Sequence, residues 1–172
     1  MFKAYAAMQA GAELELIEFD PSPIGADEVE IDVENCGICH SDLSMIDNEW
    51  GMTTYPLIAG HEVVGLIRDK GAAVSQFKIG QRVGLGWFKG FCNHCSACQQ
   101  GDHNLCATAD MTIVGHHGGF ADKVRANASS VVALPDNIDP QSAGPLFCGG
   151  ITVFNPLLQF NIQPSAKVAV IG

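Results

Sequence analysis

Four cysteines lie close together in one short stretch of the chain. Cys92, Cys95, Cys98 and Cys106 follow the spacing C-x2-C-x2-C-x7-C. Four thiolates from one loop can surround a tetrahedral zinc ion and leave no open position, which indicates a structural site. Zinc bound in this way contributes about 10–16 kcal/mol in small zinc-finger peptides, so it can order a loop that lacks regular structure. On spacing alone, an iron–sulfur cluster remains an alternative.

Composition and charge limit what kind of protein carries this loop. The chain has 172 residues, of which 47% are apolar and 16% charged, as in a globular domain with at most the start of a second one. The net charge is −10 and the nine Lys and Arg residues are scattered, which argues against a nucleic-acid partner. The acidity itself indicates no more than solubility.

The chain shows no targeting or membrane segment. Residues 1–15 contain no apolar core of a signal peptide, and no apolar run approaches the ~20 residues that cross a bilayer. We therefore expect a cytoplasmic protein without a membrane partner. In that reducing compartment, the seven cysteines are expected to be metal ligands or free thiols rather than disulfides.

The first 135 residues favour strands. Val29–Glu34 alternates apolar and acidic residues, which predicts a half-buried strand. A short helix is expected at His40–Ile46, with Leu43 and Ile46 facing inward. Further strands are expected at Lys3–Ala7 and Glu13–Glu18, which form a hairpin, and at Val63–Ile67, Arg82–Trp87, Phe120–Arg125 and Ser130–Leu134.

The pattern changes after residue 138. Asp139 before Pro140 predicts the start of a helix that runs to about Phe147. A second helix is expected at Ile151–Leu158, although Pro156 weakens it. The apolar run Lys167–Ile171 ends in Gly172, which is typical of a buried parallel strand that leads into a glycine-rich turn.

Three further elements carry metal-ligating groups, but they are far apart in sequence. They are Cys39-His40-Ser41-Asp42, Gly60-His61-Glu62 and Cys148-Gly149-Gly150-Ile151-Thr152. Each is a weak signal alone, because a histidine after a glycine is more often a turn or core residue than a ligand. Spacing by itself cannot assemble them into one site.

Together with the four-cysteine loop, and in this order, the three elements resemble the zinc-dependent medium-chain alcohol dehydrogenases. The stretches 39–51 and 142–158 are similar to the cinnamyl-alcohol-dehydrogenase branch, and within it to bacterial NADPH-dependent aldehyde reductases. The resemblance implies a mainly β fold with short helices. Residues 1–149 would be a GroES-like β-barrel catalytic domain, and residues 150–172 the connecting helix and first strand of a Rossmann cofactor domain.

The resemblance also implies a ligand set. Cys39, His61 and Cys148 would hold a catalytic zinc ion with one open position, as is known for alcohol dehydrogenase. Glu62 would be a carboxylate that can approach this zinc, and Asp42 would orient His61. With the four-cysteine loop, two zinc ions per chain are expected.

The remaining site residues follow from the same resemblance. Zinc would polarise an aldehyde for hydride transfer from NAD(P)H, and the Ser41 hydroxyl would be the first group of the proton relay. NADP(H) is favoured over NAD(H) by resemblance alone. His40 would contact the cofactor pyrophosphate, Thr152 would lie beside the nicotinamide, and Trp50 and Trp87 would line the substrate pocket.

Several points depart from the family pattern or stay open. Ser44 stands where many relatives carry a histidine that links the relay to solvent, which leaves the exit of the proton open. The chain alone is expected to be inactive, and a homodimer is possible. Two rival interpretations are a zinc-free relative similar to quinone reductases and a non-enzymatic, zinc-stabilised GroES-like interaction module.

Overall fold

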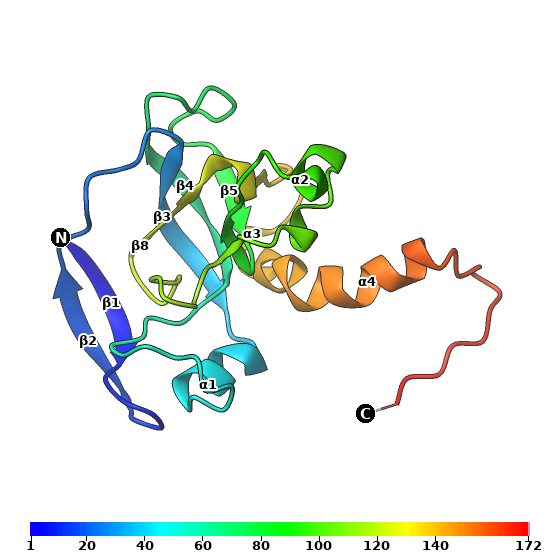
Figure 1. The fold of residues 1–172 in the computed structure, drawn as a ribbon, viewed down its shortest axis with the longest axis horizontal. Coiled ribbons are helices and arrows are strands. Elements are labelled where there is room, and N and C mark those ends of the chain that lie inside the picture. Colours follow the sequence, from blue (N-terminus) through cyan, green and yellow to red (C-terminus); the bar gives the residue numbers. More distant parts are fainter. Residues whose placement is uncertain (172) are drawn as a thin grey trace.

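A five-stranded antiparallel sheet forms the centre of the computed structural model, which describes residues 1–171. Its strand order is β8-β3-β4-β5-β9 (Figure 1). The longest strands, β3 and β4, pair over most of their length and have two register shifts. The five strands are β3 (Glu28–Gly37), β4 (Glu62–Lys70), β5 (Arg82–Leu85), β8 (Lys123–Asn127) and β9 (Val131–Ala133).

Two smaller sheets extend this centre. The predicted hairpin is confirmed as β1 (Phe2–Ala7) and β2 (Leu14–Phe19), which pair antiparallel. Backbone hydrogen bonds attach β1 to the rest, from Tyr5 N to Phe120 O and from Ala7 N to Leu57 O, both 2.8 Å. The third sheet pairs β6 (Phe88–Gly90) with β7 (Asp110–Met111). The expected mainly β fold with short helices is confirmed.

Apolar side chains from one face of the central sheet form the main core. Val29 and Ile31 of β3 are fully buried, as their alternation predicts. Each such side chain contributes roughly 1.5–3 kcal/mol when it leaves water. Glu30, between them, faces the other way and is still buried, because Arg125 pairs with it at 2.7 Å. The core consists of Val29, Ile31, Val63, Ile67, Val74, Phe77, Val83, Leu85, Val124, Ala126, Ala128 and Val131.

Helix α1 (His40–Ile46) has the predicted bounds, and Ile46 packs inward as predicted, but Leu43 does not. Leu43, expected inside, is 48% exposed, whereas Asp42 and Met45 are buried. Asp42 and Met45 are three residues apart and therefore share one helix face. The hydrogen bonds of Asp42 turn that face inward, so the prediction for Leu43 is wrong.

Short helices fill the loops between strands. The four-cysteine loop contains α2 (Ser96–Gln100) and the 3-10 turn η1 (His103–Leu105), and η2 (Ala128–Ser130) precedes β9. The helix expected after Asp139 is split into α3 (Pro140–Ala143) and the 3-10 helix η3 (Gly144–Phe147). The carboxylate of Asp139 caps α3 by accepting a 3.0 Å hydrogen bond from Gln141 N.

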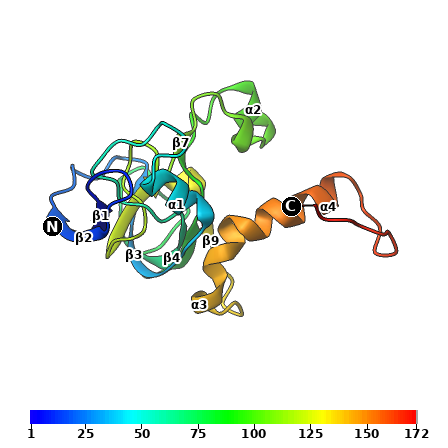
Figure 2. The same cartoon turned by 90° about the horizontal axis from the view of Figure 1, so that it is seen from below.

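The second expected helix is α4 (Gly149–Gln159), which projects away from the sheets (Figure 2). None of its residues is buried. The strand predicted at Lys167–Ile171 is not formed within this chain, and its place in a Rossmann sheet stays a prediction. That segment has no regular structure, because no described strand lies beside it to supply hydrogen bonds. The glycine expected to open a fingerprint, Gly172, lies outside the described residues, and the boundary between residues 149 and 150 stays a prediction.

Strand bounds differ slightly from expectation elsewhere. The strand expected at Phe120–Arg125 begins and ends later, as β8, and the one expected at Arg82–Trp87 stops at Leu85. Among residues 1–171, no helix has the length and apolar character needed to cross a bilayer.

Candidate metal centre

Three distant segments bring four potential ligands together. Cys39 precedes α1, His61 and Glu62 stand at the start of β4, and Cys148 lies between η3 and α4. One ligand atom from each of these residues lies within 4.8 Å of the others. The Sγ atoms of Cys39 and Cys148 are 3.8 Å apart, and His61 Nε2 is 3.2 Å from the Cys148 Sγ.

This geometry fits a zinc ion. With Zn–S bonds of about 2.3 Å, two sulfur ligands of a tetrahedral ion lie roughly 3.8 Å apart, which matches the separation of Cys39 and Cys148. Two thiols and one imidazole are donors that suit zinc. Three such ligands leave a fourth position, and the Glu62 carboxylate lies within reach of it.

Asp42 holds the histidine in place. His61 Nδ1 lies 2.9 Å from Asp42 Oδ1, and both side chains are almost fully buried. The same carboxylate accepts hydrogen bonds from the backbone N–H of Gly60 at 2.8 Å and of Cys39 at 3.0 Å. Because a carboxylate only accepts, Nδ1 carries the proton and Nε2 presents its lone pair toward Cys148. The role proposed for Asp42 therefore has a geometric basis.

The electrostatics of the cluster follow from burial and neighbouring charges. Burial lowers the pKa of His61, but the hydrogen bond and charge of Asp42 raise it by more, to above its ordinary value. Burial, and then the neighbouring Cys39, raise the pKa of Cys148 to about 12. For Cys39, burial is outweighed by hydrogen bonds, led by those of Ser41, so that its pKa is lowered. A bound cation would allow both sulfurs to be thiolates at this separation.

Glycines leave the room that the cluster needs. A Cβ on Gly37 would lie 2.1 Å from Glu62 Oε2, so the carboxylate occupies the space beside this glycine. A Cβ on Gly84 of β5 would lie 1.9 Å from the ring of Phe147, the residue before Cys148. Both distances are shorter than the contacts that real Cβ atoms make. The two glycines thus leave room for the Glu62 side chain and for the Phe147 ring beside Cys148.

A cleft of about 920 Å³ opens beside the cluster. Ser41, Trp50, Trp87 and Thr152 line it together with Cys148. The rings of Trp50 and Trp87 meet edge to face with centroids 6.1 Å apart, and Trp87 also packs against His61 at 5.1 Å. His40 is exposed and is not part of the cleft wall.

Two features of this region were not predicted from the sequence. Ser44 is buried and its hydroxyl donates a 2.7 Å hydrogen bond to Glu49 Oε2, so this position holds a serine–glutamate pair. Phe91, Asp102 and Asn104 of the four-cysteine loop also line the cleft. No sequence signal marks these residues, because the loop pattern indicates only a structural site.

The four-cysteine loop forms a second cluster. All four sulfurs lie within 4.8 Å of one another, and the Sγ of Cys92 is 3.9 Å from that of Cys98 and 3.6 Å from that of Cys106. These separations match ligands of one tetrahedral ion, whereas cysteines on different irons of a cluster lie farther apart. Gly101 ends α2 with a left-handed φ of 87°, which turns the chain toward Cys106.

Comparisons with known proteins give matches along the whole chain. Residues 25–136 match the alcohol dehydrogenase GroES-like domain. The aldehyde reductase AdhA of Synechocystis sp. is 59% identical over the whole of this chain, which covers 51% of that protein. The chain therefore spans about half the length of the curated relatives that it matches.

Solved structures also match nearly the whole chain and about half of their own length. A cinnamyl alcohol dehydrogenase of Sorghum bicolor has a TM-score of 0.90 and 36% identity over 96% of this chain and 50% of that one. A CAD of Helicobacter pylori, solved in complex with NADP(H), has a TM-score of 0.91 and 30% identity over 96% and 50% of the two chains.

Proposed function

The chain belongs to the zinc-dependent medium-chain alcohol dehydrogenases, in the cinnamyl-alcohol-dehydrogenase branch, and we propose that it is the catalytic portion of an NAD(P)-dependent aldehyde reductase or alcohol dehydrogenase. The reaction would move a hydride between NAD(P)H and an aldehyde or primary alcohol. The observation that carries the proposal is the convergence of Cys39, His61 and Cys148 on one point at the wall of the cleft.

The ligand set defines the metal chemistry. A zinc ion held by Cys39, His61 and Cys148 would act as a Lewis acid toward a carbonyl oxygen. Asp42 positions His61 through the 2.9 Å hydrogen bond to Nδ1 and does not itself touch substrate. Glu62 lies close enough to occupy the fourth position between substrate molecules. Cys92, Cys95, Cys98 and Cys106 would hold a second, structural zinc.

Ser41 would supply the proton. Hydride addition to the carbonyl carbon leaves negative charge on the oxygen, which needs one proton to become the alcohol. The Ser41 hydroxyl lines the cleft with Cys148, and a hydroxyl can donate to that oxygen while accepting from a second group. The cofactor ribose would be this second group. Trp50 and Trp87 would pack against the organic part of the substrate and keep water away.

The cofactor would be NADP(H) rather than NAD(H). The support is the relative solved with NADP(H) and the match to an aldehyde reductase. Thr152, on the cleft side of α4, would lie beside the nicotinamide. His40 is exposed at the first turn of α1, where it is free to reach the pyrophosphate.

The rival interpretations explain less of the geometry. A zinc-stabilised interaction module accounts for the four-cysteine cluster alone. It offers no reason for a second cluster of metal-ligating side chains beside a cleft. A relative similar to zinc-free quinone reductases would need neither set of thiols.

The test is an activity assay on two forms of the protein. A longer form that carries a cofactor domain should reduce aldehydes with NADPH, and the 172-residue chain should not. Cys148→Ser should abolish turnover in the longer form. Cys36→Ser is the matched control, because Cys36 is buried but belongs to neither ligand cluster. Turnover that survives Cys148→Ser would contradict the proposed function.

A further inference from the structure

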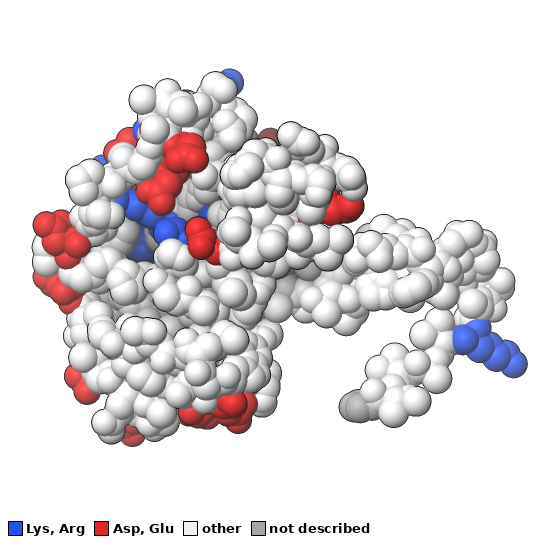
Figure 3. Space-filling view, viewed as in Figure 1, with Lys and Arg blue, Asp and Glu red and all other residues white. Residues whose placement is uncertain are grey.

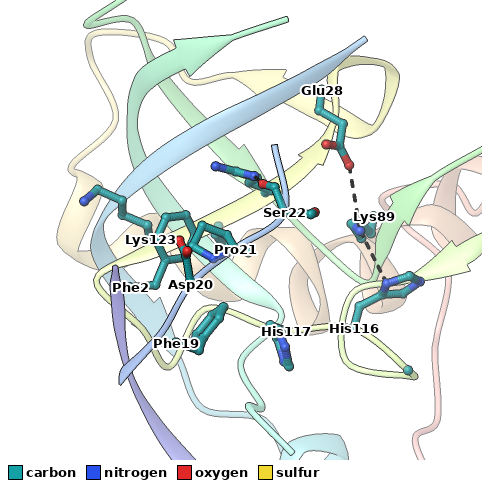
Figure 4. A pocket seen from close by; sticks show the side chains of 13 residues that line it. Phe2, Phe19, Asp20, Pro21, Ser22, Glu28, Lys89, His116, His117 and Lys123 are labelled. Carbon is teal, nitrogen blue, oxygen red and sulfur yellow. Dashed lines mark hydrogen bonds and ion pairs between the residues drawn. The ribbon is translucent and has the colours of Figure 1, made fainter. Parts of the chain in front are cut away.

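The hollows of this molecule differ in chemistry. One, of about 290 Å³, lies between the connection after β2 and the loop before β8, and Figure 3 shows Lys and Arg atoms in its depth and Asp and Glu atoms around it. Its charged side chains contact one another. Lys89 lies between Glu28 and His116, as Figure 4 shows, and Arg125 pairs with Glu30. The cleft beside the metal centre is lined instead by a pair of tryptophans.

Trp50 has a defined place in that cleft although it does not belong to a buried core. The centroid of its ring lies 6.1 Å from that of Trp87 in an edge-to-face contact, and Trp87 meets His61 in the same way at 5.1 Å. One ring therefore separates Trp50 from a potential metal ligand. Trp50 is nevertheless 46% exposed, so burial restrains its side chain only in part. The backbone that carries the ring has to supply the remaining restraint.

The segment that carries Trp50 folds back on helix α1. Asn48 and Gly51, which flank it, have left-handed φ values of 57° and 68°. The side chain of Asn48 accepts a 3.0 Å hydrogen bond from Thr53 N, and the Thr53 hydroxyl donates to Met45 O at 2.6 Å. These bonds close the turn on the end of the helix and fix where the segment begins and ends.

Glu49 ties the residue before Trp50 to the buried side of the helix. Its backbone N–H donates to Ser44 O at 2.9 Å, and its carboxylate accepts a 2.7 Å hydrogen bond from the Ser44 hydroxyl. A serine inside a helix often bonds to the carbonyl four residues before it, but this hydroxyl donates to Glu49. Because Ser44 is buried, water is nearly out of its reach as another acceptor. The contact therefore holds both the main chain and the side chain of Glu49.

We propose that Glu49 is a positioning residue of the aldehyde site. Through Ser44 it holds Trp50 against Trp87, and the two rings set where the organic part of an aldehyde lies relative to the metal ligands. This inference rests on the proposed function, which assigns both tryptophans to the substrate pocket. Glu49 lies outside the cleft wall formed by the described residues. It acts as a hydrogen-bond acceptor, so its negative charge is not required.

The first test measures the tryptophan pair in the 172-residue chain and needs no activity. Trp50 and Trp87 are the two tryptophans of this chain, and two indoles in contact give an exciton couplet in the far-ultraviolet circular dichroism spectrum. Trp50→Phe should abolish the couplet and so assign it. Glu49→Met keeps the length of the side chain but removes the acceptor. It should weaken the couplet as much as Ser44→Ala does, and the double variant should weaken it no further, because both changes remove one interaction.

Two further variants separate the hydrogen bond from charge and from a general loss of order. Glu49→Gln keeps an accepting oxygen and should retain the couplet. Asp47→Ala removes an exposed carboxylate at the end of the same helix and should retain it as well. A full couplet in Glu49→Met would overturn the proposal, and so would an equal loss in Glu49→Gln or Asp47→Ala.

A longer form that carries a cofactor domain extends the test to the substrate. Glu49→Met should raise KM for benzaldehyde about tenfold and leave kcat unchanged, because a displaced ring weakens ground-state and transition-state binding alike. KM for acetaldehyde should stay the same, since this aldehyde has no ring to meet Trp50. Equal rises for the two aldehydes would contradict the positioning role. A longer form that reduces neither aldehyde would instead contradict the proposed function, and the spectra of the shorter chain would still decide the role of Glu49.

Discussion

At the scale of single residues, Asp42 organises the metal centre. One buried carboxylate accepts hydrogen bonds from His61, Gly60 and Cys39, so it fixes an imidazole, the turn before it and the backbone of a thiol ligand. Loss of such a partner of a ligand typically lowers metal affinity about 10- to 100-fold.

Asp42→Asn tests this role. The change removes the negative charge and replaces one accepting oxygen with a donor, so that the bond from Cys39 N is lost. We expect zinc affinity at the Cys39–His61–Cys148 site to fall about 10- to 100-fold, measured by competition with a chromophoric chelator. Asp47→Asn, in an exposed aspartate after the same helix, should have no effect. Unchanged affinity in Asp42→Asn would mean that the hydrogen bonds do not tune the site.

The residues of the candidate site were predictable from sequence only where several motifs occur together. The ligands Cys39, His61 and Cys148 are 22 and 87 residues apart along the chain, and only resemblance joined them. Leu43 shows the limit. Its apolar character favoured burial, but the hydrogen bonds of Asp42 determine which helix face turns inward, and the sequence does not display those partners.

At the scale of elements, packing between β5 and η3 places the last ligand. The Phe147 ring rests directly on Gly84 of β5, and Cys148 follows immediately in the chain. Neither Gly84 nor Phe147 belongs to the ligand cluster. The position of the sulfur nevertheless depends on a strand-to-helix contact that has no room for a methyl group.

Gly84→Ala should therefore act on stability and on metal binding together. Overpacking of this kind costs about 1–3 kcal/mol, and the displaced Phe147 should carry Cys148 away from Cys39. Urea unfolding and zinc content measure the two effects. Gly149→Ala is the control, because a Cβ there meets nothing within 4 Å. Full zinc occupancy in Gly84→Ala would show that the chain adjusts without moving the sulfur.

We expect the four-cysteine loop to depend on a bound zinc ion more than the sheets do. Its regular structure is limited to α2, with five residues, and one 3-10 turn. Removal of zinc with a strong chelator should increase hydrogen exchange at residues 92–106 and leave β3 and β4 protected. Exchange that rises equally throughout the chain would mean that this zinc supports the whole fold.

Elements were predicted best where a local pattern is sufficient. The alternation in β3 and the Asp139-Pro140 helix start both appear at the expected places. The strand expected at Lys167–Ile171 does not form, since an apolar run becomes a strand only when neighbouring strands supply hydrogen bonds. Local sequence carries no information about such a partner.

At the scale of the whole molecule, both clusters of potential metal ligands lie next to one cleft. Cys148 belongs to the first cluster and lines the cleft directly, while Asp102 and Asn104 reach it from the loop of the second. Helix α4 supplies a further wall and projects beyond the sheets (Figure 2). Large apolar side chains of α4, among them Phe154 and Leu158, are exposed on this helix.

The most direct test of the account is anomalous diffraction at the zinc edge from crystals of this chain. Two peaks per chain are predicted. One should lie roughly 2.3 Å from the sulfurs of Cys39 and Cys148 and about 2.0–2.1 Å from His61 Nε2, and the other should lie among the four cysteines of the loop. A single peak in the four-cysteine loop, with none at His61 in zinc-saturated protein, would contradict the central claim that three distant side chains share one catalytic metal ion.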